Sequence, residues 1–245
     1  ALLKRNELPK NTFVIGCGRG DKKANTFKNL DEKISKNSEY IKVDTSNLDD
    51  FKILKKKLNS LKSKSKADEI NLISYLSTPP QSYEDIIINI IKSEINKEEY
   101  GYSRIVIEKP FGQNLNSAKK LNKLLKTGFN ENQIFRIDHY LGKETVQNIL
   151  VSRYSNLVFN ALWNREHISY VEITAAESIG IKKRGEYYDK SGALKDMIQN
   201  HLLELLSLIA MNDPKENSPD SIRDEKVNVL KSIKNVDYKN NIVSG

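Results

Sequence analysis

The chain has 245 residues, 38% of them hydrophobic, and a formal net charge of +8 at pH 7. This length is enough to bury one large core or two smaller ones, and no apolar run reaches the roughly 20 residues that a membrane-spanning helix needs. The single cysteine, Cys17, excludes an intrachain disulfide and suits a reducing compartment, so we expect a cytoplasmic protein. The basic residues carry no interleaved aromatic pattern, which argues against a nucleic-acid-binding protein.

Two kinds of apolar segment alternate along the first part of the chain. Strands are expected in the short β-prone runs at residues 12–15, 71–76, 104–107 and 134–137. Helices are expected where apolar residues recur at helical spacing, from Ser46 through Leu61 and at 82–95, 115–125 and 143–155. This alternation predicts an α/β fold in which crossover helices connect the strands of a parallel sheet.

The pattern changes after Trp163. Residues 169–175 alternate with period two, which is typical of a half-exposed antiparallel strand, and a helix is expected at 192–211. We therefore place a domain boundary near residues 155–165, so that one domain covers residues 1–155 and a second begins at 156 and continues to 245.

A glycine-rich segment, Gly16 to Gly20, follows the first expected strand. A dinucleotide fingerprint needs glycine at its first, third and sixth positions, but the sixth position here is Asp21, so the match is poor. In Rossmann-like folds an arginine at the end of the second strand pairs with the 2′-phosphate of NADP. Arg19 suits that role, and a solvated arginine in a turn is the alternative.

Glu108-Lys109-Pro110 comes directly after the expected strand at 104–107. Open α/β sheets bind ligands at the carboxyl ends of their strands. We therefore expect Lys109 to have a functional role and not to be an ordinary surface lysine. The sequence leaves the cis or trans state of the Lys109–Pro110 bond open.

Residues 136–144 read Arg-Ile-Asp-His-Tyr-Leu-Gly-Lys-Glu and follow the last expected strand of the first domain. Packing explains such a cluster of polar groups poorly. His139, Tyr140 and Lys143 can together bind a phosphate dianion through charge-assisted hydrogen bonds. We therefore expect a site for a small, oxygenated anion, with ordinary polar residues at a strand end as the alternative.

His201 lies on the inward face of the helix expected at 192–211. A buried core histidine is one interpretation. The other is a general base, since the pKa of imidazole lies near neutrality and a carboxylate on its second nitrogen would fix the tautomer. Asp138 is the expected partner. No metal-binding motif, such as His-x-x-x-His, paired cysteines or an acid-rich loop, occurs in the sequence, so no metal ligands are expected.

Several blocks resemble the glucose-6-phosphate dehydrogenase family across nearly the whole chain. They are Leu8–Phe13, Ile107–Gly112, Arg136–Glu144 with Val146–Asn148, Trp163–Arg165, Asp196–Leu203 and Arg223–Val227. The resemblance implies a Rossmann-like coenzyme domain followed by the start of an α+β domain with a large antiparallel sheet. It also implies oxidation of glucose 6-phosphate at C1 with hydride transfer to NADP, the first step of the pentose phosphate pathway.

The resemblance assigns a role to each matching residue. His201 would take the proton from the C1 hydroxyl, and Asp138 would pair with it. The residues expected to bind substrate are Lys109, His139, Tyr140, Lys143, Glu177 and Asp196, of which His139, Tyr140 and Lys143 hold the phosphate and Glu177 and Asp196 the sugar hydroxyls. The residues expected to bind NADP are Arg19, Pro79, Pro80, Tyr83 and Lys109.

The chain also departs from the family pattern. Its Ala1 is expected to lie inside the helix that follows the family's pyrophosphate loop, and Gly245 to lie early in the sheet domain that normally forms the dimer interface. We therefore expect about half of a family member, inactive as it stands and homo-oligomeric only as part of a longer protein. Two alternatives stay open: another NADP-linked sugar oxidoreductase that carries Glu108-Lys109-Pro110, and a non-catalytic sugar-phosphate binding module.

Overall fold

The computed structural model describes residues 9, 11–21, 35–65, 69–99, 101–176, 180, 185–216, 218–235 and 237–241. The chain divides into two compact units, residues 1–136 and residues 137–245, each of which is described below by itself. Among the described residues, no helix combines the length and the apolar character required to cross a membrane.

Unit 1 contains two parallel sheets. Strands β1 (Val14–Gly18) and β2 (Ser38–Lys42) pair in parallel. The second sheet has the order β3 (Leu72–Leu76), β4 (Ser103–Ile107) and β5 (Ile134–Arg136), and both of its pairings are also parallel. The expected α/β fold with parallel strands is therefore confirmed, whereas β2 was not predicted.

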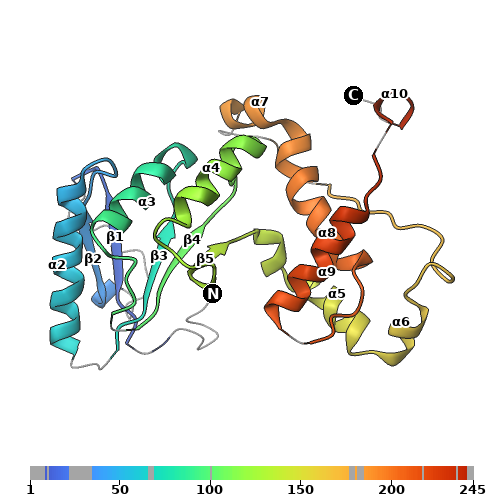
Figure 1. The fold of residues 1–245 in the computed structure, drawn as a ribbon, viewed down its shortest axis with the longest axis horizontal. Helices are drawn as coiled ribbons and strands as arrows, with labels where there is room; N and C mark the ends of the chain where they lie inside the picture. The colour runs from blue at the N-terminus through green and yellow to red at the C-terminus, as the bar shows by residue number, and fades with distance from the viewer. Residues whose placement is uncertain are drawn as a thin grey trace. The chain divides into compact units, whose positions relative to one another are not determined.

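Three long helices of unit 1 connect these strands and lie beside one another in Figure 1: α2 (Leu48–Ser65), α3 (Tyr83–Lys92) and α4 (Leu115–Leu125). The start of α4 is fixed by a capping box, in which Asn114 and Ser117 satisfy each other's backbone N–H groups. Two single-turn helices, η1 (Pro80–Ser82) and η2 (Glu131–Gln133), precede α3 and β5. Ile87, Ile105 and Leu125 have 0% exposure and form the centre of the core between helices and strands.

Unit 2 is helical in its described residues. Its elements are η3 (His139–Gly142), α5 (Glu144–Tyr154), α6 (Leu157–Leu162), α7 (Gly185–Ala193), η5 (Leu194–Leu202), α8 (Leu203–Ala210), α9 (Pro219–Ser232) and α10 (Tyr238–Asn241). A small core of Val146, Leu208 and Met211 joins α5 to α8, and Ile222 and Val229 of α9 pack against it. This core fixes the position of α5, which follows η3, relative to α8, which follows η5. The candidate site lies on η3 and η5.

Two expectations for unit 2 need correction. The helix expected at 192–211 is present from residue 193 to residue 210, but its first part, η5, is a π-helix and not an α-helix, and Gly192 before it adopts φ 64°, which glycine tolerates. Residues 169–175 form no strand, and the large antiparallel sheet is not seen in the part of the chain that the structure describes. A strand needs a hydrogen-bonded neighbour, and Tyr170 is 77% exposed instead of being packed in a sheet.

Arg153, in α5, is buried and caps the C-terminal end of α8. Its guanidinium donates from Nη1 to the carbonyl of Leu208 at 2.6 Å and from Nη2 to the carbonyl of Met211 at 2.8 Å. Trp163 Nε1 donates to the carbonyl of Ile209 at 2.8 Å. The last carbonyls of a helix have no partner within the helix and carry the negative end of its dipole. A buried cation therefore stabilises the end of α8 and ties it to α5.

Replacing Arg153 with methionine removes both donors and leaves buried carbonyls unpaired. We expect a loss of about 2–4 kcal/mol in the free energy of unfolding, because an unsatisfied buried polar group costs about 1–3 kcal/mol. Urea unfolding followed by circular dichroism measures this loss. Arg223→Met is the matched control, because Arg223 forms an exposed pair with Asp220 and its loss should leave the transition unchanged within error. Equal losses in the two variants would contradict the capping role of Arg153.

Candidate active site

The carboxylate of Asp138 contacts the ring of His201 in unit 2. Asp138 caps the N-terminus of η3, where its Oδ1 accepts a hydrogen bond from the N–H of Tyr140 at 2.9 Å. The same oxygen lies 2.6 Å from Nδ1 of His201, whose side chain is only 1% exposed. The cap fixes the carboxylate, so the imidazole meets a negative charge that is already in position.

The other nitrogen and one face of the His201 ring also have close neighbours. Its Nε2 lies 3.0 Å from Nε2 of His139. The ring of Tyr140 stacks on it, with centroids 3.9 Å apart and planes inclined by 13°, and the ammonium of Lys143 lies 3.6 Å from the centroid of the Tyr140 ring. Contacts with both nitrogens and with a ring face leave His201 one well-defined orientation.

The π-helix η5 contributes a second buried acid. Asp196 and His201 are both buried residues of η5. They are five positions apart, and because π-helical hydrogen bonds join residues i and i+5, both lie on the same side of the helix. This π-helix lies in the ribbon between α7 and α8 in Figure 1.

These neighbours define what the cluster can do chemically. A carboxylate at Nδ1 favours the tautomer with hydrogen on that nitrogen, which leaves a lone pair on Nε2 that can accept a proton. His139 and Lys143 are exposed at the same place, and both are donors suited to an anion. A buried base beside exposed cationic groups suits a substrate that has both a hydroxyl group and a phosphate.

The residues expected to bind the coenzyme lie at the carboxyl ends of strands in unit 1. Arg19 is exposed directly after β1. Two hydrogen bonds from Ser46 hold the pKa of Asp44 below its ordinary value, and the charge of Arg19 lowers this pKa further. Arg19 is therefore near the loop after β2, the edge where a nucleotide phosphate is expected.

The turn after β4 carries Lys109, and its bond to Pro110 is cis. Tyr75, near the end of β3, donates a hydrogen bond to the carboxylate of Glu108, and this bond is the main cause that raises the pKa of Tyr75 to about 12. Tyr83 is 2% exposed and belongs to the core, with its hydroxyl 3.5 Å from the carbonyl of Glu108. Tyr75 was not among the residues expected at the site, and its place near the carboxyl end of an expected strand was the only signal for it in the sequence.

Pro79, Pro80 and Glu177 are the remaining residues that were expected at the site. Pro79 is exposed and Pro80 half-buried at the start of η1, next to the end of β3. Glu177 lies outside the described residues.

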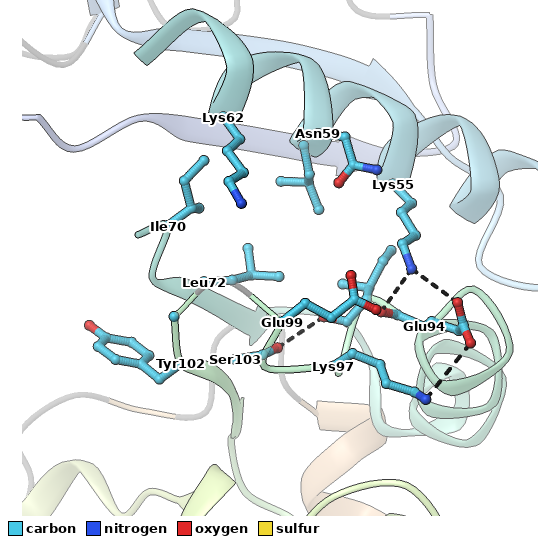
Figure 2. Close-up of a pocket in the computed structure, with 13 residues that line it drawn as sticks. Lys55, Asn59, Lys62, Ile70, Leu72, Glu94, Lys97, Glu99, Tyr102 and Ser103 are labelled. Atoms are coloured by element: carbon cyan, nitrogen blue, oxygen red, sulfur yellow. Dashed lines mark hydrogen bonds and ion pairs between the residues drawn. The ribbon is translucent and has the colours of Figure 1, made fainter. Parts of the chain in front are cut away.

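A pocket in unit 1 lies at the opposite ends of the same strands. Figure 2 shows it next to Leu72 and Ser103, the first residues of β3 and β4. Its Lys55 and Lys97 both pair with Glu94, at 3.2 Å and 3.8 Å. Because open α/β sheets bind ligands at the carboxyl ends of their strands, this pocket does not belong to the expected coenzyme site.

Comparison with known proteins matches the chain to two family domains, whose boundary lies later in the chain than the division into units at residues 136–137. Residues 1–148 match the family model "Glucose-6-phosphate dehydrogenase, NAD binding domain", and residues 150–245 match "Glucose-6-phosphate dehydrogenase, C-terminal domain". A glucose-6-phosphate 1-dehydrogenase of Treponema pallidum is 45% identical over 94% of this chain and 48% of its own length. One of Ceratitis capitata is 41% identical over 95% of this chain and 46% of its own length.

Solved structures give the same result. A glucose-6-phosphate dehydrogenase in complex with its substrate glucose-6-phosphate has a TM-score of 0.87 at 34% identity, covering 97% of this chain and 52% of that one. The enzyme of Mycobacterium avium has a TM-score of 0.81 at 30% identity, covering 97% of this chain and 54% of that one. The chain spans about half the length of the curated relatives it matches. With family models matched over both of its units, the chain belongs to the glucose-6-phosphate dehydrogenase family.

Proposed function

We propose that the natural polypeptide that contains this chain oxidises glucose 6-phosphate at C1 to 6-phosphoglucono-lactone and transfers a hydride to NADP, as the first step of the pentose phosphate pathway. The observation that carries this proposal is the 2.6 Å contact between Asp138 and the buried His201. It supplies an oriented general base in a chain whose relatives are glucose-6-phosphate dehydrogenases.

In this proposal the lone pair on Nε2 of His201 takes the proton of the C1 hydroxyl. As the O–H bond breaks, the C1–O bond becomes the carbonyl of the lactone and the hydrogen on C1 leaves with its electron pair. NADP, when bound, accepts that hydride. Asp138 stabilises the imidazolium that forms. Because Nε2 of His139 lies 3.0 Å from the Nε2 that must act, His139 turns away when the substrate enters.

We assign the phosphate of the substrate to His139, Tyr140 and Lys143. The imidazole and the ammonium are exposed next to the base, and charge-assisted donors of this kind bind phosphate most strongly. Tyr140 is buried, so its contribution is limited to the hydroxyl. The proposed contacts of Asp196 and Glu177 with sugar hydroxyls, and of Lys109 with substrate and coenzyme, stay predictions from the resemblance.

We further propose that the nucleotide-binding unit prefers NADP. The support is Arg19, an exposed guanidinium near the ends of β1 and β2, where an arginine can pair with a 2′-phosphate. Pro79 and Pro80 would line the coenzyme groove. Because Tyr83 is buried, it would support this groove indirectly, through the contact of its hydroxyl with the carbonyl of Glu108.

Replacing His201 with asparagine removes the proposed base. We expect kcat with glucose 6-phosphate to fall by about 10²–10⁴-fold, while calorimetry still detects binding of the sugar phosphate. NADPH formation, followed by absorbance, measures the rate, and His167→Asn, which changes an exposed histidine, is the control with unchanged activity. Asp138→Asn keeps the helix cap and should also lower kcat.

Three results would contradict the proposal. A His201→Asn variant with more than a tenth of the normal activity would exclude this residue as the base. Equal activity on unphosphorylated glucose would indicate one of the broader sugar oxidoreductases. A folded protein that binds glucose 6-phosphate without oxidising it would be the non-catalytic binding module.

Replacing Arg19 with alanine tests the coenzyme preference. The KM for NADP should rise by about tenfold or more, the effect of losing one charge-assisted contact of about 1.5–3 kcal/mol, whereas the KM for NAD should change little. Initial rates with both coenzymes decide this. If both KM values rise equally, Arg19 does not contact the 2′-phosphate.

We also propose that residues 169–175 join a large antiparallel sheet in the natural polypeptide and that subunits associate through this sheet. Tyr170 and Val171 are exposed, and the sequence around them has the period-two alternation that is typical of a half-exposed antiparallel strand. Light scattering coupled to size-exclusion chromatography should then give a homo-oligomer, and Tyr170→Lys should shift it toward monomer. A monomeric natural polypeptide would contradict this proposal.

A further inference from the structure

Two imidazole nitrogens face each other in unit 2. Nε2 of His139 and Nε2 of His201 lie 3.0 Å apart. A neutral imidazole offers one N–H and one lone pair, so the two rings can share one proton, whereas two protonated rings would repel each other. Because Asp138 contacts Nδ1 of His201, the lone pair of His201 is on Nε2 and is directed at His139.

This arrangement contains the parts of a transition-metal site. Zn²⁺ binds imidazole nitrogen at about 2.0–2.1 Å in a tetrahedral geometry, which places two ligating nitrogens about 3.3 Å apart. The observed separation of 3.0 Å needs only a small opening, and His139 is exposed and therefore able to move. Ligand atoms of Asp138, His139 and His201 all lie within 4.8 Å of one another.

Asp138 occupies the outer-shell position of such a site. A metal-binding histidine ordinarily donates its second N–H to a carboxylate, which orients the ring and raises its basicity. The contact between Asp138 and Nδ1 of His201 provides this arrangement with the Nε2 atom directed at the second imidazole. Two nitrogen ligands favour Zn²⁺, Ni²⁺ or Cu²⁺ over Mg²⁺ and Ca²⁺, which prefer oxygen.

We propose that His139 and His201 form a binding site for a divalent transition-metal cation of the Zn²⁺ class, with Asp138 as the outer-shell partner of His201. Water fills the remaining coordination positions on the exposed side of His139. The site differs from a metalloenzyme centre because the cation takes up the lone pair that the proposed reaction needs.

A regulatory consequence rests on the proposed function. The cation and the sugar phosphate compete for the same two rings, since His201 is the proposed base and His139 a proposed phosphate ligand. Zn²⁺ is therefore an inhibitor that raises the apparent KM for glucose 6-phosphate and leaves kcat unchanged at saturating substrate. Mg²⁺ at the same concentration has no such effect.

Direct binding is measured first, without substrate or coenzyme. Zn²⁺ is titrated into the natural polypeptide that contains this chain, in competition with a chromogenic chelator and in phosphate-free buffer. His139→Ala is the decisive variant because His139 is exposed and its truncation leaves the core intact. We expect its affinity for Zn²⁺ to fall at least tenfold, with a similar fall in His201→Ala, whereas His167→Ala, also an exposed histidine of unit 2, keeps the wild-type affinity.

The outcomes separate this proposal from the proposed function. Equal Zn²⁺ affinity in the wild type and in His139→Ala overturns the metal site, whatever the enzymatic activity. Loss of Zn²⁺ binding in His139→Ala supports the site even if the protein fails to oxidise glucose 6-phosphate. In an active enzyme, Zn²⁺ inhibition that glucose 6-phosphate does not relieve overturns the competition between cation and substrate.

Discussion

The packing of α5 against α8 is the constraint on which the candidate site depends. His139 and His201 are 62 residues apart in the chain, and each belongs to a short helical segment next to one of these two helices. The packing of Val146 against Leu208 and Met211 holds α5 and α8 together. Arg153 adds two charge-assisted hydrogen bonds at the end of α8. Loosening the packing of α5 against α8 would separate the imidazole of His201 from the carboxylate of Asp138 without changing either residue.

The sequence predicted the elements of unit 1 well because their signals are local. Buried parallel strands are short apolar runs, and their helices repeat apolar residues at helical spacing, so the expected helix at 115–125 coincides with α4. Strand β2, Ser38–Lys42, was missed because only Tyr40 and Ile41 in it are apolar. Its existence depends on pairing with β1, and pairing of distant segments is not visible in a single run of residues.

The residue types of the candidate site and the pairing of Asp138 with His201 could be predicted from the sequence, whereas the other contacts could not. Asp138, His139 and Tyr140 stand together in the sequence, and their chemistry could be inferred from that cluster. The π-helical turn of η5 and the facing nitrogens of His139 and His201 depend on long-range packing. For the same reason a search for metal-binding spacings finds nothing here, since such motifs require ligands that are near one another in the chain. The period-two pattern at 169–175 shows the opposite case, because the described residues include no neighbouring strand with which this segment pairs.

The features that make a good general base also make a good metal ligand. A carboxylate on Nδ1 makes Nε2 of His201 a better acceptor for a proton, and the same lone pair can bind Zn²⁺. A base of this kind avoids a resident metal only if its surroundings supply few further ligands. Here His139 is a close nitrogen donor, and it is the residue that the proposed phosphate recognition requires. Under the two proposals, the histidine that recognises the phosphate also supplies the second metal ligand, so that the proposed sensitivity to transition metals follows from the proposed substrate specificity.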